Sequence, residues 1–394
     1  MKAKKIALSV VASALLLSFA GCGDDSSNND STPAAAVTPG VTGDGRETVY
    51  TALVADNADT TGVTLNAATS TPSSLAWASS VALPTYDASN EVNVTANITA
   101  DTTWLANKQY RLVGQIKVSN NATLTIPAGT VVFGDAGANY MVVLKGSKLV
   151  AEGTAANPIT FTSLTALQGG AAGQGQWGGL TLLGDAPTNH TAPVYEVDED
   201  DTDFAFGGTT AADDSGSLKY VRILNSGYTV ATDLEINGLS LCGVGSGTTV
   251  ENIYVENSSD DGIEIWGGTV DLTDIEIVNA GDDSFDLDYG YVGNVSNLTV
   301  TQESTAHAGM EISSGGDTPL TSPTISNFRV TTFTGSDEGG IYLKDDTTAP
   351  TFINGLVHHT GDTTTHGAIR AKSVPTTDAA NALAFKNVVL DPAE

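Results

Sequence analysis

Two stretches of the chain share one pattern of hydrophobic and polar positions at a fixed interval. Residues 252–268 read NIYVENSSDDGIEIWGG and residues 274–290 read DIEIVNAGDDSFDLDYG, so that Ile253 falls on Ile275 after a step of 275 − 253 = 22 residues. Apolar and polar residues alternate on both sides of an acidic corner, which predicts two short strands in each stretch. A unit this short cannot bury its own apolar face, so the repeat predicts that each unit stacks on the next.

The same pattern continues in both directions, with corners of varying length between the strands. Further copies have their paired strands at 297–300 and 309–312, 327–330 and 340–343, and 354–357 and 368–371; an earlier copy has them at 219–224 and 238–241. Upstream strands are expected at 110–118, 122–126, 130–133, 141–144, 148–150, 159–161 and 177–183. We therefore expect an all-β chain whose residues 106–394 form a single right-handed parallel β-helix.

The N-terminal 22 residues have the features of a secretory signal, with lysines followed by an apolar stretch at 6–19. The signal ends in Phe19, Ala20, Gly21 and Cys22, which resembles the lipobox of bacterial lipoproteins and implies lipid attachment at Cys22. An ordinary cleaved signal with a chance cysteine is the alternative. Gly23 in place of aspartate resembles lipoproteins of the outer membrane, so we expect a lipid-anchored protein of the outer membrane or cell surface.

The next two segments connect this signal to the repeats. Residues 23–45 are polar and contain proline, which predicts a disordered tether. Residues 46–105 carry little periodic signal, and we expect them to cover the first open edge of the β-helix as an N-terminal cap. Cys242 is the one cysteine outside the signal and lies in an apolar strand, so we expect it to be buried and unpaired.

The charge of the chain is strongly unbalanced, with 46 acidic and 16 basic residues giving −30. Nucleic acid and anionic membrane faces would be repelled, so we expect no nucleic-acid partner and membrane contact only through the lipid anchor. Divalent cations or cationic ligands fit this charge, and so does an acidic surface that serves only solubility.

Residues 184–217 interrupt the stack with an acidic insert. Alternating acidic residues at 196–203 have the oxygen density of a calcium loop. The glycine that an EF-hand loop needs at its sixth position is absent, however, and Asp203 is followed by Phe204. We therefore expect a solvated acidic loop.

Several motifs resemble those of bacterial surface proteins and lipoproteins that form right-handed parallel β-helices. The motifs are the strands of 122–161, the Trp177-Gly-Gly strand, Phe206-Gly-Gly-Thr with residues 218–223, and the two Asp-Asp coils. The resemblance covers about residues 95–300 and implies a pectate-lyase-like solenoid. It says little about activity, because a fold does not fix a function.

Equivalent side chains in stacked coils lie about 4.8 Å apart, so repeated acids form columns. Glu264, Asp286 and Glu311 occupy the outward position between inward apolar residues, and repulsion in such a column favours a bound cation or raised pKa values. Calcium is the expected ion. The candidate ligands are Asp260, Asp261, Glu264, Asp282, Asp283, Asp286 and Asp288.

The outward columns change character beyond this acidic patch. Glu311 is followed by Tyr342 and Arg370, while Trp266 heads the neighbouring column. These four residues predict a face that binds an extended polar polymer. The alternative is that opposite charges pair between coils and contribute little.

The acidic corners also resemble, more weakly, those of polygalacturonases. Asp260-Asp261-Gly262, Gly281-Asp282-Asp283 and Ala306-His307-Ala308 fall where that family has acidic and histidine motifs, and Lys344 falls near its basic strand. The resemblance implies a general acid at Asp282 or Asp283 and water activation by Asp261, as in an inverting hydrolase.

Three functions follow from these observations. The first is a surface lipoprotein whose acidic β-helix face binds a glycan, a surface polymer or a protein partner, with calcium as the candidate cofactor. The second is a carbohydrate-active hydrolase or lyase acting at residues 260–288. The third is a structural component of a surface assembly.

Overall fold

The computed structural model describes residues 39–41, 48–50, 72, 74–198, 201–231, 234–302, 306–315, 318–333, 336, 338–345, 348–360, 368–371 and 384–392. The signal at 1–22, the lipidation site Cys22 and most of the tether lie outside these residues. Within the described part, no helix combines the length and apolar character needed to cross a membrane.

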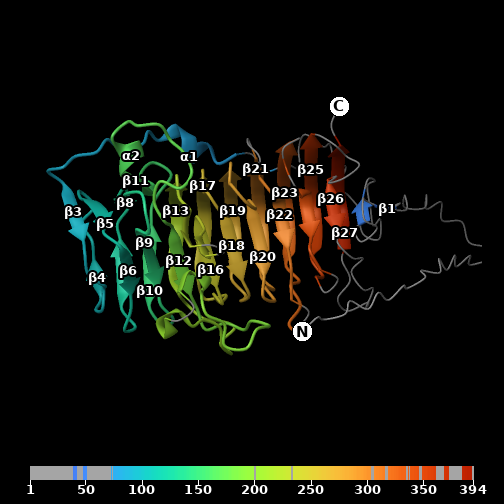
Figure 1. Ribbon diagram of the computed structural model, residues 1–394, viewed down its shortest axis with the longest axis horizontal. Coiled ribbons are helices and arrows are strands. Elements are labelled where there is room, and N and C mark those ends of the chain that lie inside the picture. Colours follow the sequence, from blue (N-terminus) through green and yellow to red (C-terminus); the bar gives the residue numbers. More distant parts are fainter. Residues whose placement is uncertain are drawn as a thin grey trace, which may run out of the picture. The chain divides into compact units, whose positions relative to one another are not determined.

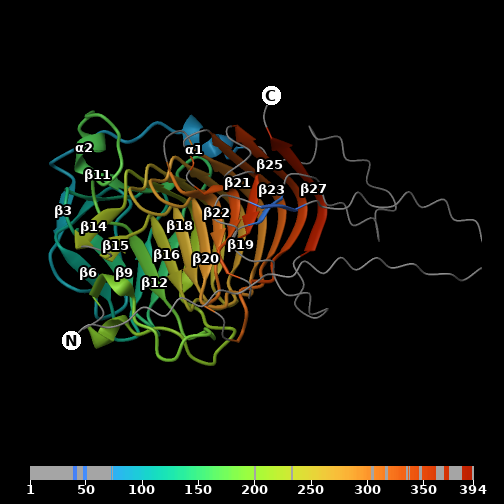
Figure 2. The ribbon, with the colours of Figure 1, turned by 45° about the vertical axis from the view of Figure 1, so that its right-hand side comes forward.

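The described chain winds into a parallel β-helix, as the repeats predict, and its strands line up side by side in Figures 1 and 2. One long sheet contains the second strand of each coil. Its described parallel strands are β6 (Gln115–Val118), β9 (Tyr140–Val143), β12 (Leu180–Leu183), β16 (Leu239–Cys242), β18 (Ile263–Trp266), β20 (Phe285–Asp288), β22 (Ala308–Ile312), β24 (Gly339–Leu343) and β26 (Ile369–Ala371), in that order.

The other long sheet contains the first strand of each coil. Its described strands, in spatial order, are β3 (Glu91–Val94), β5 (Gln109–Leu112), β8 (Val131–Gly134), β11 (Ile159–Ser163), β13 (Gly216–Leu224), β17 (Thr249–Glu256), β19 (Asp271–Val278), β21 (Asn294–Thr301), β23 (Thr324–Phe333), β25 (Thr351–Thr360) and β27 (Ala384–Pro392). The strands β4 (Thr102–Thr103), β7 (Thr123–Ile126) and β10 (Lys148–Glu152) join it at β13.

The register of the repeat is confirmed strand by strand. Ile253 pairs with Ile275, and Ile275 pairs with Leu298 on the next coil. The expectation of a single strand at 110–118 is wrong. Gly114 adopts φ 78° and turns the chain there, so that β5 and β6 lie in different sheets. Stacked apolar residues from both sheets fill one continuous core.

Asparagine side chains support the corners between strands. Asn225, Asn257 and Asn279 occupy equivalent corners with φ between 57° and 60°, a left-handed region that asparagine tolerates better than most residues. The Asn279 amide donates to Asn257 at 2.7 Å, and the Asn257 amide donates to Asn225 at 3.3 Å. The corner sequence therefore fixes both the bend and the bonding between coils.

Residues 74–90 differ from the N-terminal cap expected over 46–105, of which 46–47, 51–71 and 73 lie outside the described residues. Their helix α1 (Ala76–Ser80) crosses the outer face of the first-strand sheet, where Arg222 donates to the carbonyls of Ala78 and Val81. The Leu75 N–H donates to Glu276 on β19. This segment is a lateral strap, and stacking already begins at β3, within the range assigned to the cap. Farther upstream, β1 (Pro39–Val41) pairs with β2 (Thr48–Tyr50), and β2 pairs with β26, the last described parallel strand of the second-strand sheet. Residues 39–41 fall within the range expected to be a disordered tether, so that expectation is wrong for these three residues.

The insert 184–217 is not a solvated loop, because its aromatic residues form a second apolar core on the outer face of the second-strand sheet. Tyr195, Phe204 and Phe206 are fully or almost fully buried against Trp266 and its neighbours. Short helices η2 (Glu196–Asp198) and η3 (Thr202–Phe204) position them, and Lys117 pairs with Asp201 and Asp203.

The remaining elements are α2 (Leu164–Leu167) and the hairpin of β14 (Tyr228–Ala231) with β15 (Leu234–Ile236). Cys242 lies in this second core and is free and buried, as predicted.

Candidate functional site

One outward column of side chains runs along the second-strand sheet. Strand pairing places Glu264 beside Asp286, Asp286 beside Glu311, and Glu311 beside Tyr342. The same column begins before the acids with Ser240, which pairs with Glu264. The predicted acidic column therefore exists, with one acid on each of three successive coils.

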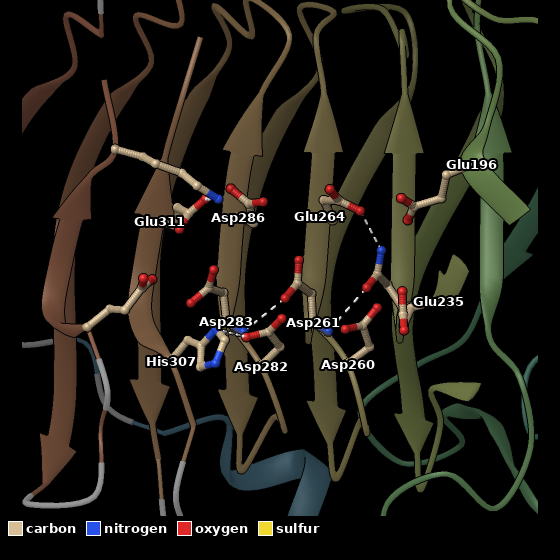
Figure 3. Close-up of a pocket in the computed structure, with 13 residues that line it drawn as sticks. Glu196, Glu235, Asp260, Asp261, Glu264, Asp282, Asp283, Asp286, His307 and Glu311 are labelled. Atoms are coloured by element: carbon tan, nitrogen blue, oxygen red, sulfur yellow. Dashed lines mark hydrogen bonds and ion pairs between the residues drawn. The ribbon is translucent and has the colours of Figure 1, made fainter. Parts of the chain in front are cut away.

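Two corner positions run parallel to this column. The register that pairs Ile263 with Phe285 also aligns Asp260 with Asp282 and Asp261 with Asp283. Figure 3 shows these corner carboxylates pointing toward the strand carboxylates rather than away from them. The acids converge because corner and strand residues border the same face of successive coils.

The convergence produces a cavity of about 360 Å³. Ten carboxylates line it, together with one amide, one histidine and one lysine, counting only described residues. The lining residues are Glu196, Glu235, Asn237, Asp260, Asp261, Glu264, Asp282, Asp283, Asp286, His307, Glu311, Glu338 and Lys344. The acidic surface is thus a cleft and not a flat face.

Elements outside the β-helix close one end of the cleft. Glu196 comes from η2 in the insert and Glu235 from β15 in the hairpin. The insert also covers the column beyond the acids, since the Tyr195 hydroxyl lies 3.3 Å from that of Ser240 and Ser240 is 1% exposed. The outward column is therefore blocked at Ser240, so the cleft does not continue past Glu264 at this end.

The far end of the cleft is also covered. Tyr342 is 3% exposed, and the Arg370 guanidinium lies over its ring at 4.5 Å. Trp266 is 6% exposed within the second apolar core. The prediction that Trp266 and Tyr342 form an exposed ligand face is wrong, because aromatic surface is more stable against neighbouring side chains than in water.

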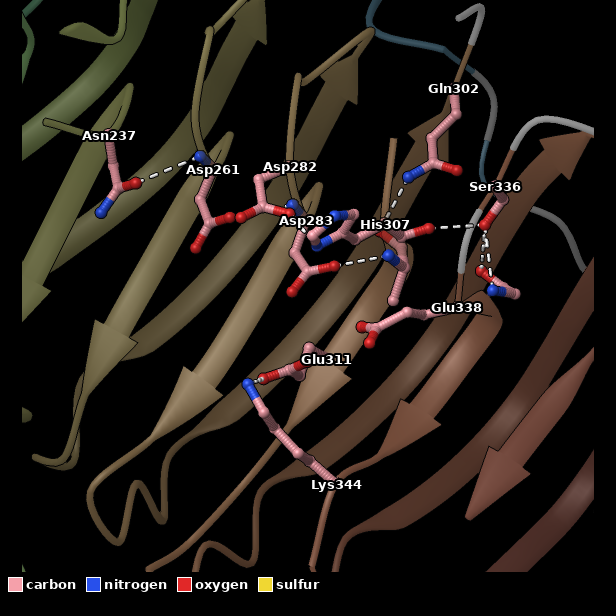
Figure 4. Close-up of polar contacts among 12 residues, drawn as sticks. Asn237, Asp261, Asp282, Asp283, Gln302, His307, Glu311, Ser336, Glu338 and Lys344 are labelled. Atoms are coloured by element: carbon pink, nitrogen blue, oxygen red, sulfur yellow. Dashed lines mark hydrogen bonds and ion pairs between the residues drawn. The ribbon is translucent and has the colours of Figure 1, made fainter. Parts of the chain in front are cut away.

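Corner aspartates cap the coil that follows them. The Asp261 N–H donates to the Asn237 side-chain oxygen at 3.1 Å, and the Asp283 N–H donates to the Asp261 carboxylate at 2.9 Å. The Ala308 N–H donates in turn to Asp283 (Figure 4). Asp261 and Asp283 consequently stabilise the corners, whatever else they bind.

The strand carboxylates have unequal partners. Glu264 accepts from the Trp266 indole and the Asn237 amide, which are both neutral donors. Glu311 accepts from the Lys344 ammonium at 2.6 Å. Asp286 lies between them, and its buried Oδ1 has no hydrogen-bond partner.

The His307 Nδ1 contacts the Asp282 carboxylate at the corner edge of the cleft, where both side chains are partly exposed. Asp288 is the one candidate ligand that does not line the cavity; its carboxylate accepts from the Tyr289 N–H. All the other candidate ligands are brought together in the cleft. The candidate catalytic residues around Asp282 line it too, namely Asp261, Asp283, His307 and Lys344.

Burial and mutual repulsion raise the pKa values of the cleft acids. Burial, with the charges of Asp282 and Glu235, raises the pKa of Asp260 to about 7. Burial also raises the pKa of Glu311 to about 7, although Lys344 opposes the shift. The pKa values of four more acids lie well above their usual range, because of burial first and neighbouring carboxylates second: Asp261, Glu264, Asp283 and Asp286.

Carboxylates at these distances cannot all remain charged without a counter-charge. Four sets of three side chains have potential ligand atoms within 4.8 Å of one another: Asp282, Asp283 and His307; Asp260, Asp261 and Asp282; Asp261, Glu264 and Asp286; Asp283, Glu311 and Glu338. Oxygen-rich sets of this kind suit hard divalent cations.

Four lining residues are absent from the candidates that the sequence suggests. Asn237 and Glu338 occupy corners equivalent to those of Asp261 and Asp282, so counting back from the paired strands would find them. Glu196 and Glu235 have no such signal, because the insert and the hairpin lie outside the repeat.

A family model described as a pectate-lyase like beta helix domain matches residues 96–391, about three quarters of the chain. The chain belongs to this family. No curated protein and no solved structure matches it. The pectate-lyase-like β-helix domain thus includes every coil that contributes to the cleft, together with the insert and the hairpin that wall it.

Proposed function

We propose that this pectate-lyase-like domain binds a divalent cation in the acidic cleft and binds carbohydrate through it. The observation that carries the proposal is the lining of the cavity, where ten carboxylates face one lysine and one histidine among the described residues. Protons can relieve part of this repulsion, but calcium would relieve it while using the oxygens as ligands.

The dimensions of the cleft limit the size of the carbohydrate that it can bind. A cavity of about 360 Å³ is at the small end of ligand sites, and both ends of its column are covered. A short saccharide segment or a single sugar residue fits these limits, whereas a long polymer lying along the sheet does not. Carbohydrate is the class of ligand suggested by the family description.

Location forms part of the proposal. If Cys22 is lipidated, the part of residues 23–45 that precedes β1 connects the β-helix to a membrane as a tether, and the cleft faces glycans at the cell surface. Palmitate labelling, lost in Cys22→Ser, tests the anchor independently of the cleft.

Cation binding is tested by isothermal titration of chelator-treated protein with calcium chloride. We expect saturable binding that is lost in Glu264→Gln, because this substitution removes the charge of a buried ligand while the side chain keeps nearly the same size. Glu251→Gln on the exposed face of β17 is the matched control. Carbohydrate binding is then measured on a glycan array with calcium and with chelator; equal signals in the two conditions would refute the calcium dependence.

Hydrolysis or lyase cleavage is a second candidate, favoured by the pair of Asp282 and His307 beside Asp283 and Asp260. A carboxyl group with its pKa raised to about 7, such as that of Asp260, can donate a proton near neutral pH. Release of reducing sugars or unsaturated products from a polysaccharide panel, abolished in Asp282→Asn, would support this candidate. Carbohydrate binding without release of products would refute this second candidate and support the binding function.

A further inference from the structure

The repeat builds two related sets of carboxylates in the cleft. The first triad is Asp261, Glu264 and Asp286, and the second triad is Asp283, Glu311 and Glu338. Asp283 is the equivalent of Asp261 one coil later, and Glu311 pairs with Asp286 as its equivalent one coil later. Two of three positions in the second triad are therefore copies of positions in the first.

The two triads differ in the positive charge that the chain itself provides. The second triad has the Lys344 ammonium 2.6 Å from Glu311, whose side chain is 3% exposed. Its third member, Glu338, lies 4.0 Å from the Arg370 guanidinium. Figure 4 shows Lys344 reaching from the strand end back to Glu311.

The first triad has no cation in hydrogen-bond contact among the described residues. Glu264 accepts only from the Trp266 indole and the Asn237 amide, and the Asp261 carboxylate accepts from a backbone N–H. The Asp286 Oδ1 is buried and has no hydrogen-bond partner. Buried anions need a counter-charge, and a buried carboxylate oxygen without a donor indicates where one is missing.

We propose that Lys344 acts as a built-in cation for the second triad, so that the cleft takes one external divalent cation, at the first triad. This inference rests on the proposed cation binding and goes beyond it in stoichiometry and position. A lysine can replace a metal ion in this role because its ammonium is a compact positive charge with three donors. The external ion is then coordinated by Asp261, Glu264 and Asp286, with Oδ1 of Asp286 as a ligand.

Stoichiometry tests the inference. Chelator-treated protein is equilibrated with calcium chloride by dialysis, and bound calcium per chain is counted by elemental analysis. We expect one ion for the natural chain and two for Lys344→Gln, in which the second triad loses its ammonium. Lys219→Gln is the matched control, because Lys219 pairs with Glu152 and Glu251 outside the cleft, and it should retain one ion.

An isosteric pair of variants tests the position in the natural background. Glu264→Gln should weaken calcium binding at least tenfold, whereas Glu338→Gln should change the dissociation constant less than twofold. Equal losses in these two variants, or one ion in Lys344→Gln, would overturn the inference while cation binding stands. A natural chain that binds no calcium at millimolar concentration would refute the proposed function and the inference with it.

Discussion

The substitution Asp286→Asn should stabilise the metal-free protein at pH 8. Asp286 lies directly between Glu264 and Glu311 in the strand column, and neighbouring strands are about 4.8 Å apart. Two unit charges at that distance repel by about 3 kcal/mol at an effective dielectric of 20. Besides burial, Glu311 is the neighbouring charge that raises the pKa of Asp286 most, and Lys344 opposes only part of this effect. Glu264 adds repulsion from the other side of the column, so we expect a gain of about 2–3 kcal/mol.

The assay is thermal unfolding with chelator at pH 8 and again at pH 4.5. At pH 8 the midpoint should rise by roughly 4–6 °C, using about 2 °C for each kcal/mol in a chain of this size. Burial raises the pKa values of Glu264 and Asp286 well above their usual range, which favours the protonated forms in the folded protein at pH 4.5, so the gain should shrink at this pH. Glu251→Gln, an exposed change of the same kind, should alter neither midpoint measurably.

The sign at pH 8 decides the outcome. A lower midpoint for Asp286→Asn in chelator would mean that the carboxylate is a net stabilising partner and that the repulsion argument is wrong. With saturating calcium the order should reverse, because the natural chain gains binding free energy that the variant loses.

Three further predictions concern pH, the corners and the insert. Asp260 and Glu311 have folded-state pKa values of about 7, above their unfolded values near 4, so their contribution to metal-free stability is full below about pH 4 and is lost as pH rises through about 7. The denaturant midpoint of the natural chain should therefore fall, relative to that of the double variant Asp260→Asn/Glu311→Gln, between about pH 4 and about pH 7; a relative rise would contradict this. Asn279→Ala should cost about 1–2 kcal/mol, because alanine is strained at φ 57° and the bond to Asn257 is lost, and Asn279→Gly should cost less than Asn279→Ala in urea unfolding. Tyr195→Ala should lower the free energy of unfolding by about 3–5 kcal/mol, because it removes a buried ring from the second core. The exposed Val230→Ala should lower it by less than about 0.5 kcal/mol. Equal urea midpoints for these two variants would show that the insert is not packed as described.

The repeat makes most of the β-helix predictable from the sequence. The 22-residue step between Ile253 and Ile275 sets the strand register, and that register alone is enough to place Glu264 beside Asp286. A period of two along each strand also separates inward isoleucines from outward acids. Local pattern and stacking agree in these coils, so the pattern has a single consistent interpretation.

Features outside the repeat are not predictable in the same way. Whether an outward side chain is exposed depends on what covers it, and the acidic composition of 184–217 favours a loop where Tyr195 and Phe204 in fact fold onto the sheet. The expectation that Trp266 is exposed fails for that reason. The strap at 74–90 has no signal in the sequence, because partners such as Glu276 are about two hundred residues away along the chain.

The lateral strap has a consequence for the order of assembly. Leu75 is synthesised early, yet the Glu276 carboxylate that receives its N–H is 201 residues later. Arg222, which holds Ala78 and Val81, likewise emerges long after them. The coils from β13 to β19 must therefore form before this segment can dock, so its docking is a late event that ties coils already wound to one another.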